Sequence, residues 1–277
     1  MVDFSYKGNI MRLRDKTAIV IGAGQGPGTG MGNGRATVIR FAQEGAAVLA
    51  VDRDLASAQE TCAMAAKDGK GACEAYAADV TSEASMRDMI AHAQKAWGRI
   101  DILHYNVGVS LAGGDAAPDA ITEEAFDRVV TINLRGMVMA CKHVLPVMRA
   151  QKSGVILGIS SIAAIENYPY VTYKATKAAM VAYVQQLAIH EAGNGIRANV
   201  ILPGLMDTPM AVDTRARHSG KPRAEVAAMR DSHVPLRKKM GTAWDVANAA
   251  LFLASDEANF ITGVALPVDG GALVKIG

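Results

Sequence analysis

The sequence predicts an α/β fold: a doubly wound parallel sheet of about seven strands with helices on both faces. Two observations support this. Short apolar runs of strand length alternate with helix-length segments along the 277 residues. The runs are continuously hydrophobic, which is typical of strands buried on both faces of a parallel sheet. We therefore expect one domain over residues 15–277, preceded by an N-terminal extension at residues 1–14.

The elements follow one another without a linker or a low-complexity tract. The first strand is Thr17–Ile21, and a glycine-dense loop leads from it into a helix near 35–44 that ends at Gly45. The second strand, near 47–51, ends in Asp52. The further strands are expected near 73–77, 100–105, 154–159, 197–202 and 264–268, and the further helices near 55–68, 83–97, 123–150, 173–192 and 244–254. This β-α alternation is the one repeat in the sequence.

Composition narrows the class of protein. Half of the residues are hydrophobic, 20% are charged and the net charge is +2, so we expect a globular protein that binds neither nucleic acid nor a membrane. The three cysteines, Cys62, Cys73 and Cys141, have no metal-like spacing, and free thiols in a reducing compartment are expected. The apolar run at Thr17–Ile21 is too short for a signal peptide or a membrane span. A cytoplasmic protein without a metal is the simplest interpretation.

The loop after the first strand has the composition of a phosphate-binding turn. Residues 22–34 read Gly-Ala-Gly-Gln-Gly-Pro-Gly-Thr-Gly-Met-Gly-Asn-Gly. Glycines in this place let backbone N–H groups approach a pyrophosphate at a helix N-terminus. The candidate contacts are Gly22, Gly24, Gly32, Asn33 and Gly34.

An acidic residue follows at the spacing of a ribose ligand. Asp52 lies 18 residues after Gly34, where a carboxylate accepts from a ribose 2′-OH. A 2′-phosphate would meet like charge there, so Asp52 favours NAD over NADP. Arg53 partly offsets that repulsion.

A tyrosine and a lysine lie four residues apart, at Tyr173 and Lys177, with Ser161 twelve residues before the tyrosine. On a helix this spacing brings the two side chains onto one face. A phenol has a pKa of about 10 and needs about 4 kcal/mol to reach neutrality. One positive charge at about 4 Å and an effective dielectric of 20 supplies about that much. Tyr170 and Lys174 repeat the pattern, but the small residues between Tyr173 and Lys177 favour that pair.

With these segments in place, the chain resembles the short-chain dehydrogenase/reductase family from about Leu13 to Gly271. The supporting segments occur in the family's order and spacing. They are Asp79-Val80, Trp97 to Leu103, Tyr105-Asn106-Val107-Gly108, Asn133, Ile159-Ser160-Ser161, Tyr173 with Lys177, Pro203-Gly204 with Thr208, Phe260 to Gly263, and Val268 to Gly271.

The resemblance implies hydride transfer between a nicotinamide and a carbonyl or alcohol carbon. It implies that Tyr173 exchanges the proton with the substrate oxygen and that Lys177 lowers the Tyr173 pKa and holds the nicotinamide ribose. Ser161 would donate to the substrate oxygen, and Asn133 would hold a water of the proton relay. The implied cofactor contacts also include Asp79, Val80, Asn106, Val107, Gly108, Pro203, Gly204 and Thr208.

Three departures from the family pattern affect the cofactor site. Ile21 replaces a threonine, and Tyr105 and Val107 replace an asparagine and an alanine. With the motif placed on the helix side, at Gly32 and Gly34, the loop carries about six extra residues. It resembles the longer cofactor loops of divergent enoyl reductases, and the exact phosphate contacts stay open.

The segment 205–240 is where the family places a substrate lid. It holds eight Lys or Arg residues and four acidic ones. One interpretation is an anionic substrate, such as a carboxylate or a phosphopantetheine-borne acyl group; the other is a solvated, mobile loop. Candidate pocket residues are Tyr168, Tyr170, Met206 and Met210, and Met-rich walls adapt to many shapes.

Three functions are compatible with these observations. The first is an NAD-dependent oxidoreductase acting on a small secondary alcohol or ketone. The second is a 3-oxoacyl-thioester reductase that uses NADPH, and the third is a dinucleotide-binding sensor or scaffold without turnover. The resemblance also implies a homotetramer or homodimer formed through the helices near 123–150 and 173–192, whose faces carry Val129, Ile132, Met137, Met139, Ala179, Val184 and Leu187.

Overall fold

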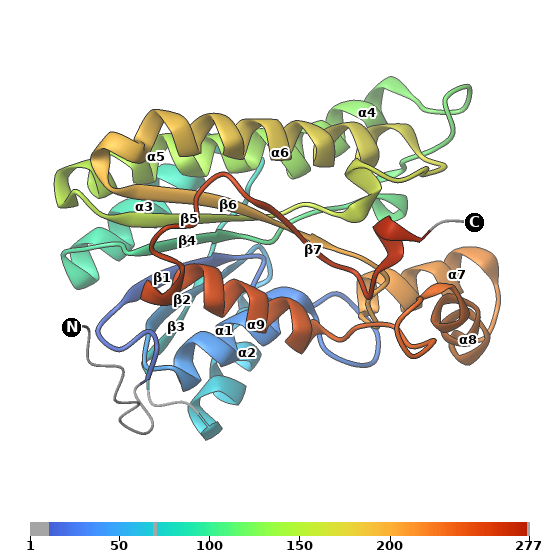
Figure 1. The fold of residues 1–277 in the computed structure, drawn as a ribbon, viewed down its shortest axis with the longest axis horizontal. Coiled ribbons are helices and arrows are strands. Elements are labelled where there is room, and N and C mark those ends of the chain that lie inside the picture. The colour runs from blue at the N-terminus through green and yellow to red at the C-terminus, as the bar shows by residue number, and fades with distance from the viewer. Residues whose placement is uncertain (1–10, 69–70, 276–277) are drawn as a thin grey trace.

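A computed structural model describes residues 11–68 and 71–275 of the chain. Its centre is one sheet of seven parallel strands in the order β3-β2-β1-β4-β5-β6-β7 (Figure 1). This confirms the predicted fold class. The strands are β1 Thr17–Ile21, β2 Ala47–Asp52, β3 Cys73–Ala77, β4 Ile102–Tyr105, β5 Gly154–Ile159, β6 Ile196–Pro203 and β7 Ala265–Val268.

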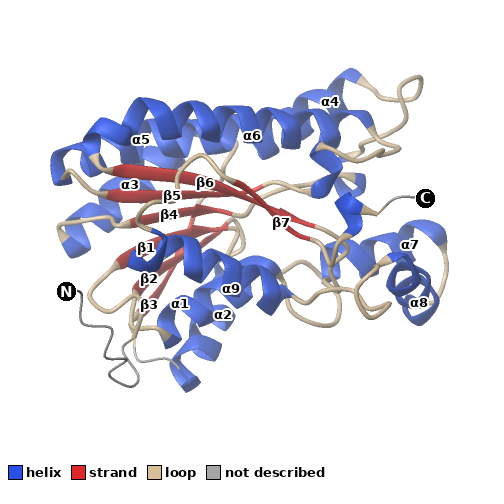
Figure 2. Ribbon diagram, viewed as in Figure 1, coloured by secondary structure: helices blue, strands red, loops and turns tan. Residues whose placement is uncertain are grey.

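Helices cover both faces of the sheet (Figure 2). One face carries α3, α5 and α6, and the other carries α1, α2 and α9. Two short helices, α7 and α8, follow β6 at the carboxyl end of the sheet. The helices are α1 Asn33–Gln43, α2 Leu55–Asp68, α3 Glu83–Trp97, α4 Glu123–Val130, α5 Gly136–Gln151, α6 Val171–Glu191, α7 Thr214–Ser219, α8 Arg223–His233 and α9 Ala243–Ala254.

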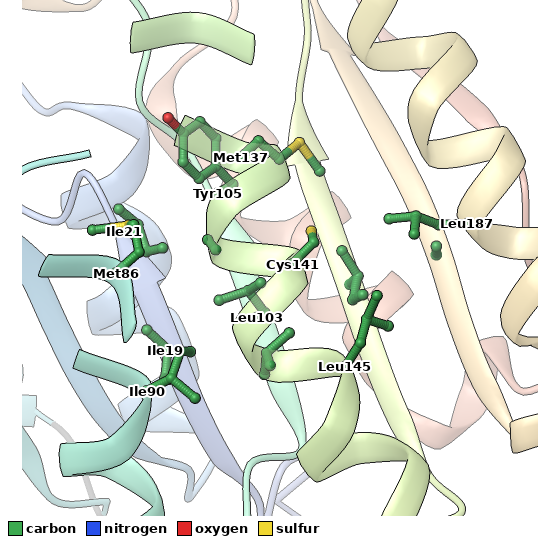
Figure 3. Close-up of a cluster of buried hydrophobic side chains, with 14 of the residues drawn as sticks. Ile19, Ile21, Met86, Ile90, Leu103, Tyr105, Met137, Cys141, Leu145 and Leu187 are labelled. Carbon is green, nitrogen blue, oxygen red and sulfur yellow. The ribbon is translucent and has the colours of Figure 1, made fainter. Parts of the chain in front are cut away.

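The hydrophobic core lies on both sides of the sheet because successive strand residues point to opposite faces. In β1, Ile19 and Ile21 pack with residues of α3, α5 and α6 (Figure 3). Ala18 and Val20 pack into the cluster beneath α1 and α9. The continuous apolar run of β1 is therefore explained, since neither face of this strand meets water.

The elements differ from the predicted ones mainly in two places. The single helix expected over 123–150 is interrupted by a π-type turn at Thr131–Arg135, between α4 and α5. The expected lid contains α7 and α8, so the interpretation of 205–240 as a solvated loop is wrong for these helical parts. Residues 1–10 of the expected N-terminal extension lie outside the described residues. Leu13, near the end of that extension, is fully buried in the core.

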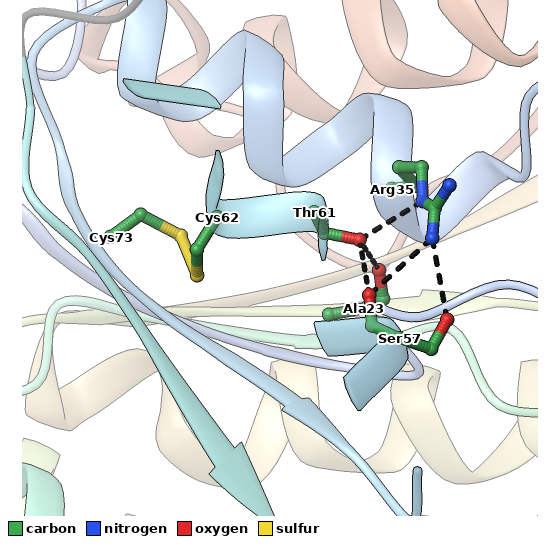
Figure 4. The surroundings of a disulfide bond; sticks show 6 residues. All are labelled: Ala23, Arg35, Ser57, Thr61, Cys62 and Cys73. Atoms are coloured by element: carbon green, nitrogen blue, oxygen red, sulfur yellow. Dashed lines mark hydrogen bonds between the residues drawn. A yellow bond between two sulfur atoms is a disulfide. The ribbon is translucent and has the colours of Figure 1, made fainter. Parts of the chain in front are cut away.

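The cysteine prediction is wrong for two of the three thiols. Cys62 on α2 and Cys73 on β3 form a disulfide, with their Cα atoms 5.3 Å apart (Figure 4). Cys141 is free and fully buried. The pair was missed because α2 folds back beside β3, a proximity that no spacing rule predicts. The inference of a reducing compartment from free thiols therefore loses its basis.

Two further predictions concern surfaces. Across residues 11–68 and 71–275, no helix is long and apolar enough to span a bilayer. The apolar residues expected to join subunits include Val129, Met137, Val184 and Leu187, and all four are buried within this chain's own core. The assembly argument therefore fails for these four residues, while Ile132, Met139 and Ala179 are partly exposed. Homo-oligomerisation itself stays a prediction.

Candidate active site

A cavity of about 550 Å³ lies at the carboxyl ends of the strands. The chain moves outward from β1 to β2 and β3 and then returns to β4 beside β1, so the strand order reverses between β1 and β4. Ligands of doubly wound sheets bind at such a switch point. The predicted residues that line the cavity are Gly22, Gly24, Gly32, Asn33, Gly34, Asp52, Arg53, Asp79, Val80, Asn106, Val107, Gly108, Ser161, Tyr168, Tyr173, Lys177, Pro203, Gly204, Met206, Thr208 and Met210.

The glycine loop forms one wall of this cavity and fits a dinucleotide phosphate. A side chain at Gly34 would run into the carbonyl oxygen of Gly22, so α1 begins in direct contact with the end of β1. The N-cap of α1 is Gly32, which provides no side-chain cap, and the first-turn amides are open to an anion. This geometry agrees with the placement of the motif at Gly32 and Gly34.

The extra loop residues contact the lid. The amide of Thr29 donates to Asp213 Oδ1 at 3.1 Å, and Arg217 Nη1 donates to the carbonyl of Pro27 at 3.1 Å. A Cβ atom at position 28 would clash with the Asp213 side chain, so a glycine is needed for the backbone to lie this close to the lid. Residues 27–29 therefore connect the cofactor loop to α7, a contact that sequence reasoning did not predict.

The Asp52 carboxylate closes the cavity on the far side of the loop. Its Oδ2 accepts from the amide of Gly24 at 2.9 Å. Ser57 Oγ accepts from the amide of Gln25 at 2.8 Å, and Thr61 donates to the carbonyl of Ala23 at 2.9 Å (Figure 4). The loop is thus held by side chains of α2, in a conformation that presents Asp52 to the cavity.

Tyr173 and Lys177 lie on α6 with the lysine ammonium 5.6 Å from the centre of the tyrosine ring. Lys177 is 2% exposed and donates to the carbonyl of Ile159 at 2.7 Å. Gly108 faces the ammonium so closely that a Cβ there would lie 2.9 Å from Nζ. The cavity floor is therefore built around the lysine.

The pKa of Tyr173 differs from the sequence expectation. Burial raises the pKa of Tyr173 to about 12, while Ser161 acts in the lowering direction. Burial also lowers the pKa of Lys177 to about 7. Desolvation disfavours both charged forms, so in the protein without cofactor the lysine does not bring the phenol near neutrality. The simple charge argument ignored this cost.

Ser161 and Asn133 have different surroundings. Ser161 lies at the end of β5 on the cavity wall, and its Oγ accepts from the amide of Ala163 at 3.1 Å. Asn133 is fully buried in the π-type turn: its Oδ1 accepts from the amide of Val109 at 2.7 Å, and its Nδ2 donates to Thr176 Oγ1 at 3.1 Å. The Asn133 side chain thus fixes the backbone beside Gly108, and its part in a proton relay stays a prediction.

Asp115 is a site residue that sequence reasoning missed. Its two carboxylate oxygens accept from the amides of Thr172 at 2.9 Å and Tyr173 at 3.0 Å. These are first-turn amides of α6, whose own N-cap residue, Tyr170, provides no side-chain bond. A buried carboxylate from a distant loop therefore orients the helix that carries Tyr173 and Lys177. Asp115 and Thr172 are 57 positions apart in the sequence, so no local pattern predicts their contact.

The predicted pocket residues divide into two groups. Tyr168, Met206 and Met210 line the cavity, but Tyr170 does not. The Tyr170 ring instead packs edge-on against Tyr168, at 5.5 Å between ring centres. Its prediction as a wall residue is wrong, because Tyr170 is the extended N-cap residue that precedes α6, and Tyr173 within the helix lines the cavity instead. Glu166, Arg215 and Arg217 also line the cavity and were not predicted as pocket residues.

A cavity at the strand switch point, beside a glycine-rich loop and an acidic strand end, defines the class of dinucleotide-binding α/β proteins. A family model described as enoyl-(acyl carrier protein) reductase matches residues 28–272. The chain belongs to the short-chain dehydrogenase/reductase family and is an oxidoreductase.

Named relatives cover nearly the whole chain. The 3-oxoacyl-(acyl-carrier-protein) reductase FabG of Thermotoga maritima is 32% identical, over 95% of this chain and 100% of its own length. The 2-(R)-hydroxypropyl-CoM dehydrogenase of Xanthobacter autotrophicus is 33% identical, over 92% of this chain and 97% of its own. Levodione reductase of Leifsonia aquatica is 31% identical, over 94% of this chain and 95% of its own length.

Solved structures show the same similarity. A protein of Burkholderia xenovorans assigned to the short-chain dehydrogenase/reductases superposes with a TM-score of 0.88 at 41% identity, covering 96% of this chain and 99% of its own. The structure of a levodione reductase gives a TM-score of 0.89 at 29% identity, covering 96% of this chain and 100% of its own. These relatives differ in the substrates that their names state, so the reaction class is common to them and the substrate is not.

Proposed function

We propose that this protein transfers a hydride between NAD(H) and a secondary alcohol or ketone, with Tyr173 as the general acid and base. The observation that carries the proposal is the joint position of Ser161, Tyr173 and Lys177 on one wall of the cavity that the glycine loop and Asp52 close. A nicotinamide bound there would supply the hydride acceptor or donor.

Each side chain has a role that follows from its surroundings. Tyr173 exchanges a proton with the substrate oxygen, and in the direction of reduction its raised pKa keeps it a proton donor. Ser161 holds the substrate oxygen beside the phenol. Lys177 would hold the nicotinamide ribose. Met206, Met210 and Tyr168 enclose the rest of the substrate.

The proposed preference for NAD rests on Asp52. Its carboxylate faces the cavity, where it would accept from a ribose 2′-OH and repel a 2′-phosphate. The similarity to a 3-oxoacyl-(acyl-carrier-protein) reductase favours a second candidate, an acyl-thioester reductase that uses NADPH. Parallel titrations with NADH and NADPH separate the two candidates, since tighter binding of NADPH would favour the second.

The proposal is tested by two neighbouring substitutions. Tyr173→Phe should lower turnover of a ketone panel by about 10²- to 10⁴-fold, the usual contribution of general acid–base catalysis, while NADH binding stays near that of the wild type. Tyr170→Phe is the matched control, because this ring lies outside the cavity. Loss of turnover in Tyr170→Phe, with activity kept in Tyr173→Phe, would contradict the assignment. Loss of NADH binding in both variants would instead indicate a folding defect.

A further inference from the structure

Some of the positively charged side chains of the lid form ion pairs, and others do not. Within residues 205–240, ion pairs join Lys221 to Glu225, Arg223 to Asp207 and Asp213, and Lys239 to Asp231. These pairs use all four acidic residues of the segment. The remaining basic residues of the lid are Arg215, Arg217, Arg230, Arg237 and Lys238.

One of the remaining basic residues, Arg215, lies at the substrate end of the cavity. Arg215, on α7, lines the cavity, and its Nη2 lies 3.4 Å from the Tyr168 hydroxyl. The Tyr168 ring lies 5.5 Å from the Tyr173 ring, between ring centres. Arg215 is therefore separated from the proposed acid–base group by a single side chain. Arg217 points away from this pair, toward the carbonyl of Pro27 in the cofactor loop.

Arg230, on α8, does not line the cavity but is close enough to Arg215 to feel its charge. It is 7% exposed, and its Nε has no hydrogen-bond partner among the described residues. Burial and the charge of Arg215 together lower its pKa to about 10. No ion pair within residues 11–68 and 71–275 includes Arg215 or Arg230. A buried guanidinium without an ion-pair partner is costly, and an oxyanion that reaches it is correspondingly stabilised.

Two carboxyl groups act on Arg230 without forming an ion pair with it. Glu166 lines the same cavity, and burial raises its pKa. Asp207 is already paired with Arg223. Lys174 is held by the carbonyls of Ala163 and Glu166, at 3.2 and 2.6 Å, and so has its own partners. Arg215 and Arg230 therefore outnumber Glu166, the carboxyl group of the cavity lining that acts on Arg230.

We propose that Arg215 and Arg230 form a subsite for an oxyanion of the substrate, such as a carboxylate, sulfonate or phosphate group. The inference rests on the proposed function, because the subsite positions a ketone or alcohol beside Tyr173. A guanidinium recognises such groups through paired N–H donors, and its charge is not lost by deprotonation. Arg215 contacts the anion, and Arg230 supplies a second charge near Arg215.

The binding test does not require turnover. Thermal unfolding is measured in sodium sulfate and in sodium chloride at equal ionic strength, for the wild type, Arg215→Gln, Arg230→Gln and Lys221→Gln. The last variant removes a lid charge that is paired with Glu225 at the surface and serves as the control. Sulfate should stabilise the wild type and the control more than chloride does, and this difference should shrink in both arginine variants. An equal sulfate response in all four proteins would overturn the subsite.

The activity test asks whether the substrate uses the subsite. The wild type should reduce 4-oxopentanoate with a kcat/KM at least about tenfold above that for pentan-2-one, the range expected for a charge-assisted contact. Arg215→Gln should bring this ratio toward one through the KM of the keto acid, and Lys221→Gln should keep it. Reduction of both ketones at a ratio near one in the wild type would overturn the inference and leave the proposed function intact. Reduction of no ketone would count against the proposed function, and the sulfate response would still decide the anion subsite.

Discussion

Asp52 Oδ2 accepts a hydrogen bond from the backbone amide of Gly24 at 2.9 Å, which joins the end of β2 to the cofactor loop. The second oxygen, Oδ1, accepts from the amide of Asp54 at 3.1 Å. The carboxylate is therefore fixed in orientation before any ligand arrives. If Asp52 selects the cofactor as proposed, the same side chain both shapes the loop and sets that choice.

Asp52→Asn should shift cofactor choice toward NADPH. The asparagine oxygen can still accept from Gly24, while the negative charge that repels a 2′-phosphate is removed. A charge pair at about 4 Å is worth about 1 to 4 kcal/mol, depending on the local dielectric, so the ratio of Kd values for NADPH and NADH should fall by about tenfold or more. Fluorescence titration with each cofactor measures the ratio. Asp54→Asn is the control, and an unchanged ratio in Asp52→Asn would remove Asp52 as the selector.

The phenol of Tyr173 should remain protonated far above neutral pH in the protein without cofactor. Burial raises its pKa to about 12, so the difference in ultraviolet absorbance between wild type and Tyr173→Phe should show no phenolate below about pH 11. The neutral phenol makes its full contribution to the free energy of unfolding below pH 10, and this contribution is lost as the pH rises toward 12. A phenolate signal near pH 7 to 8 would show that Lys177 controls this group without cofactor.

Asp115→Ala should weaken the start of α6. The carboxylate accepts from two first-turn amides, and a lost cap costs about 1 to 2 kcal/mol. Denaturant unfolding should show that loss in the free energy of unfolding, and kcat should fall because Tyr173 is displaced. Asp119→Ala, an exposed acid in the same loop, is the matched control. Equal stability and equal kcat in the two variants would exclude an orienting role for Asp115.

Asp213→Ala should loosen the cofactor loop from the lid. Asp213 accepts from the Thr29 amide and pairs with Arg223, and a hydrogen bond to a charged group is worth about 1.5 to 3 kcal/mol. We expect the KM for the cofactor to rise by about tenfold, with a smaller change in kcat. Glu225→Ala removes an exposed lid carboxylate and is the control. If both variants raise the KM equally, the effect is a general one of lid charge.

The local hydrophobic pattern of the sequence was sufficient to predict most strands of the sheet and most of the helices that cover it. The helices at 55–68 and 83–97 and the strands at 73–77 and 154–159 have the predicted bounds. The strand at 154–159 is mostly buried and leaves a continuous apolar run, whereas 73–77 is a partly exposed edge strand whose place followed from the β-α alternation. The lid helices were missed, since α7 has only six residues and α8 lies in a highly charged segment. The π-type turn at Thr131–Arg135 left no periodic signal either.

The sequence by itself determined the candidate residues that the motifs mark: the glycine loop, Asp52, Ser161, and Tyr173 with Lys177. For Tyr173 and Lys177, four residues apart on α6, the spacing along one element already fixes their proximity. The tertiary structure alone decided which groups from distant segments meet: Asp115 with the start of α6, Thr29 with Asp213, and Arg215 with Arg230 beside Tyr168. It also decided the pKa values of Tyr173 and Lys177, because desolvation depends on what the whole fold packs around a charge and not on its neighbours in sequence.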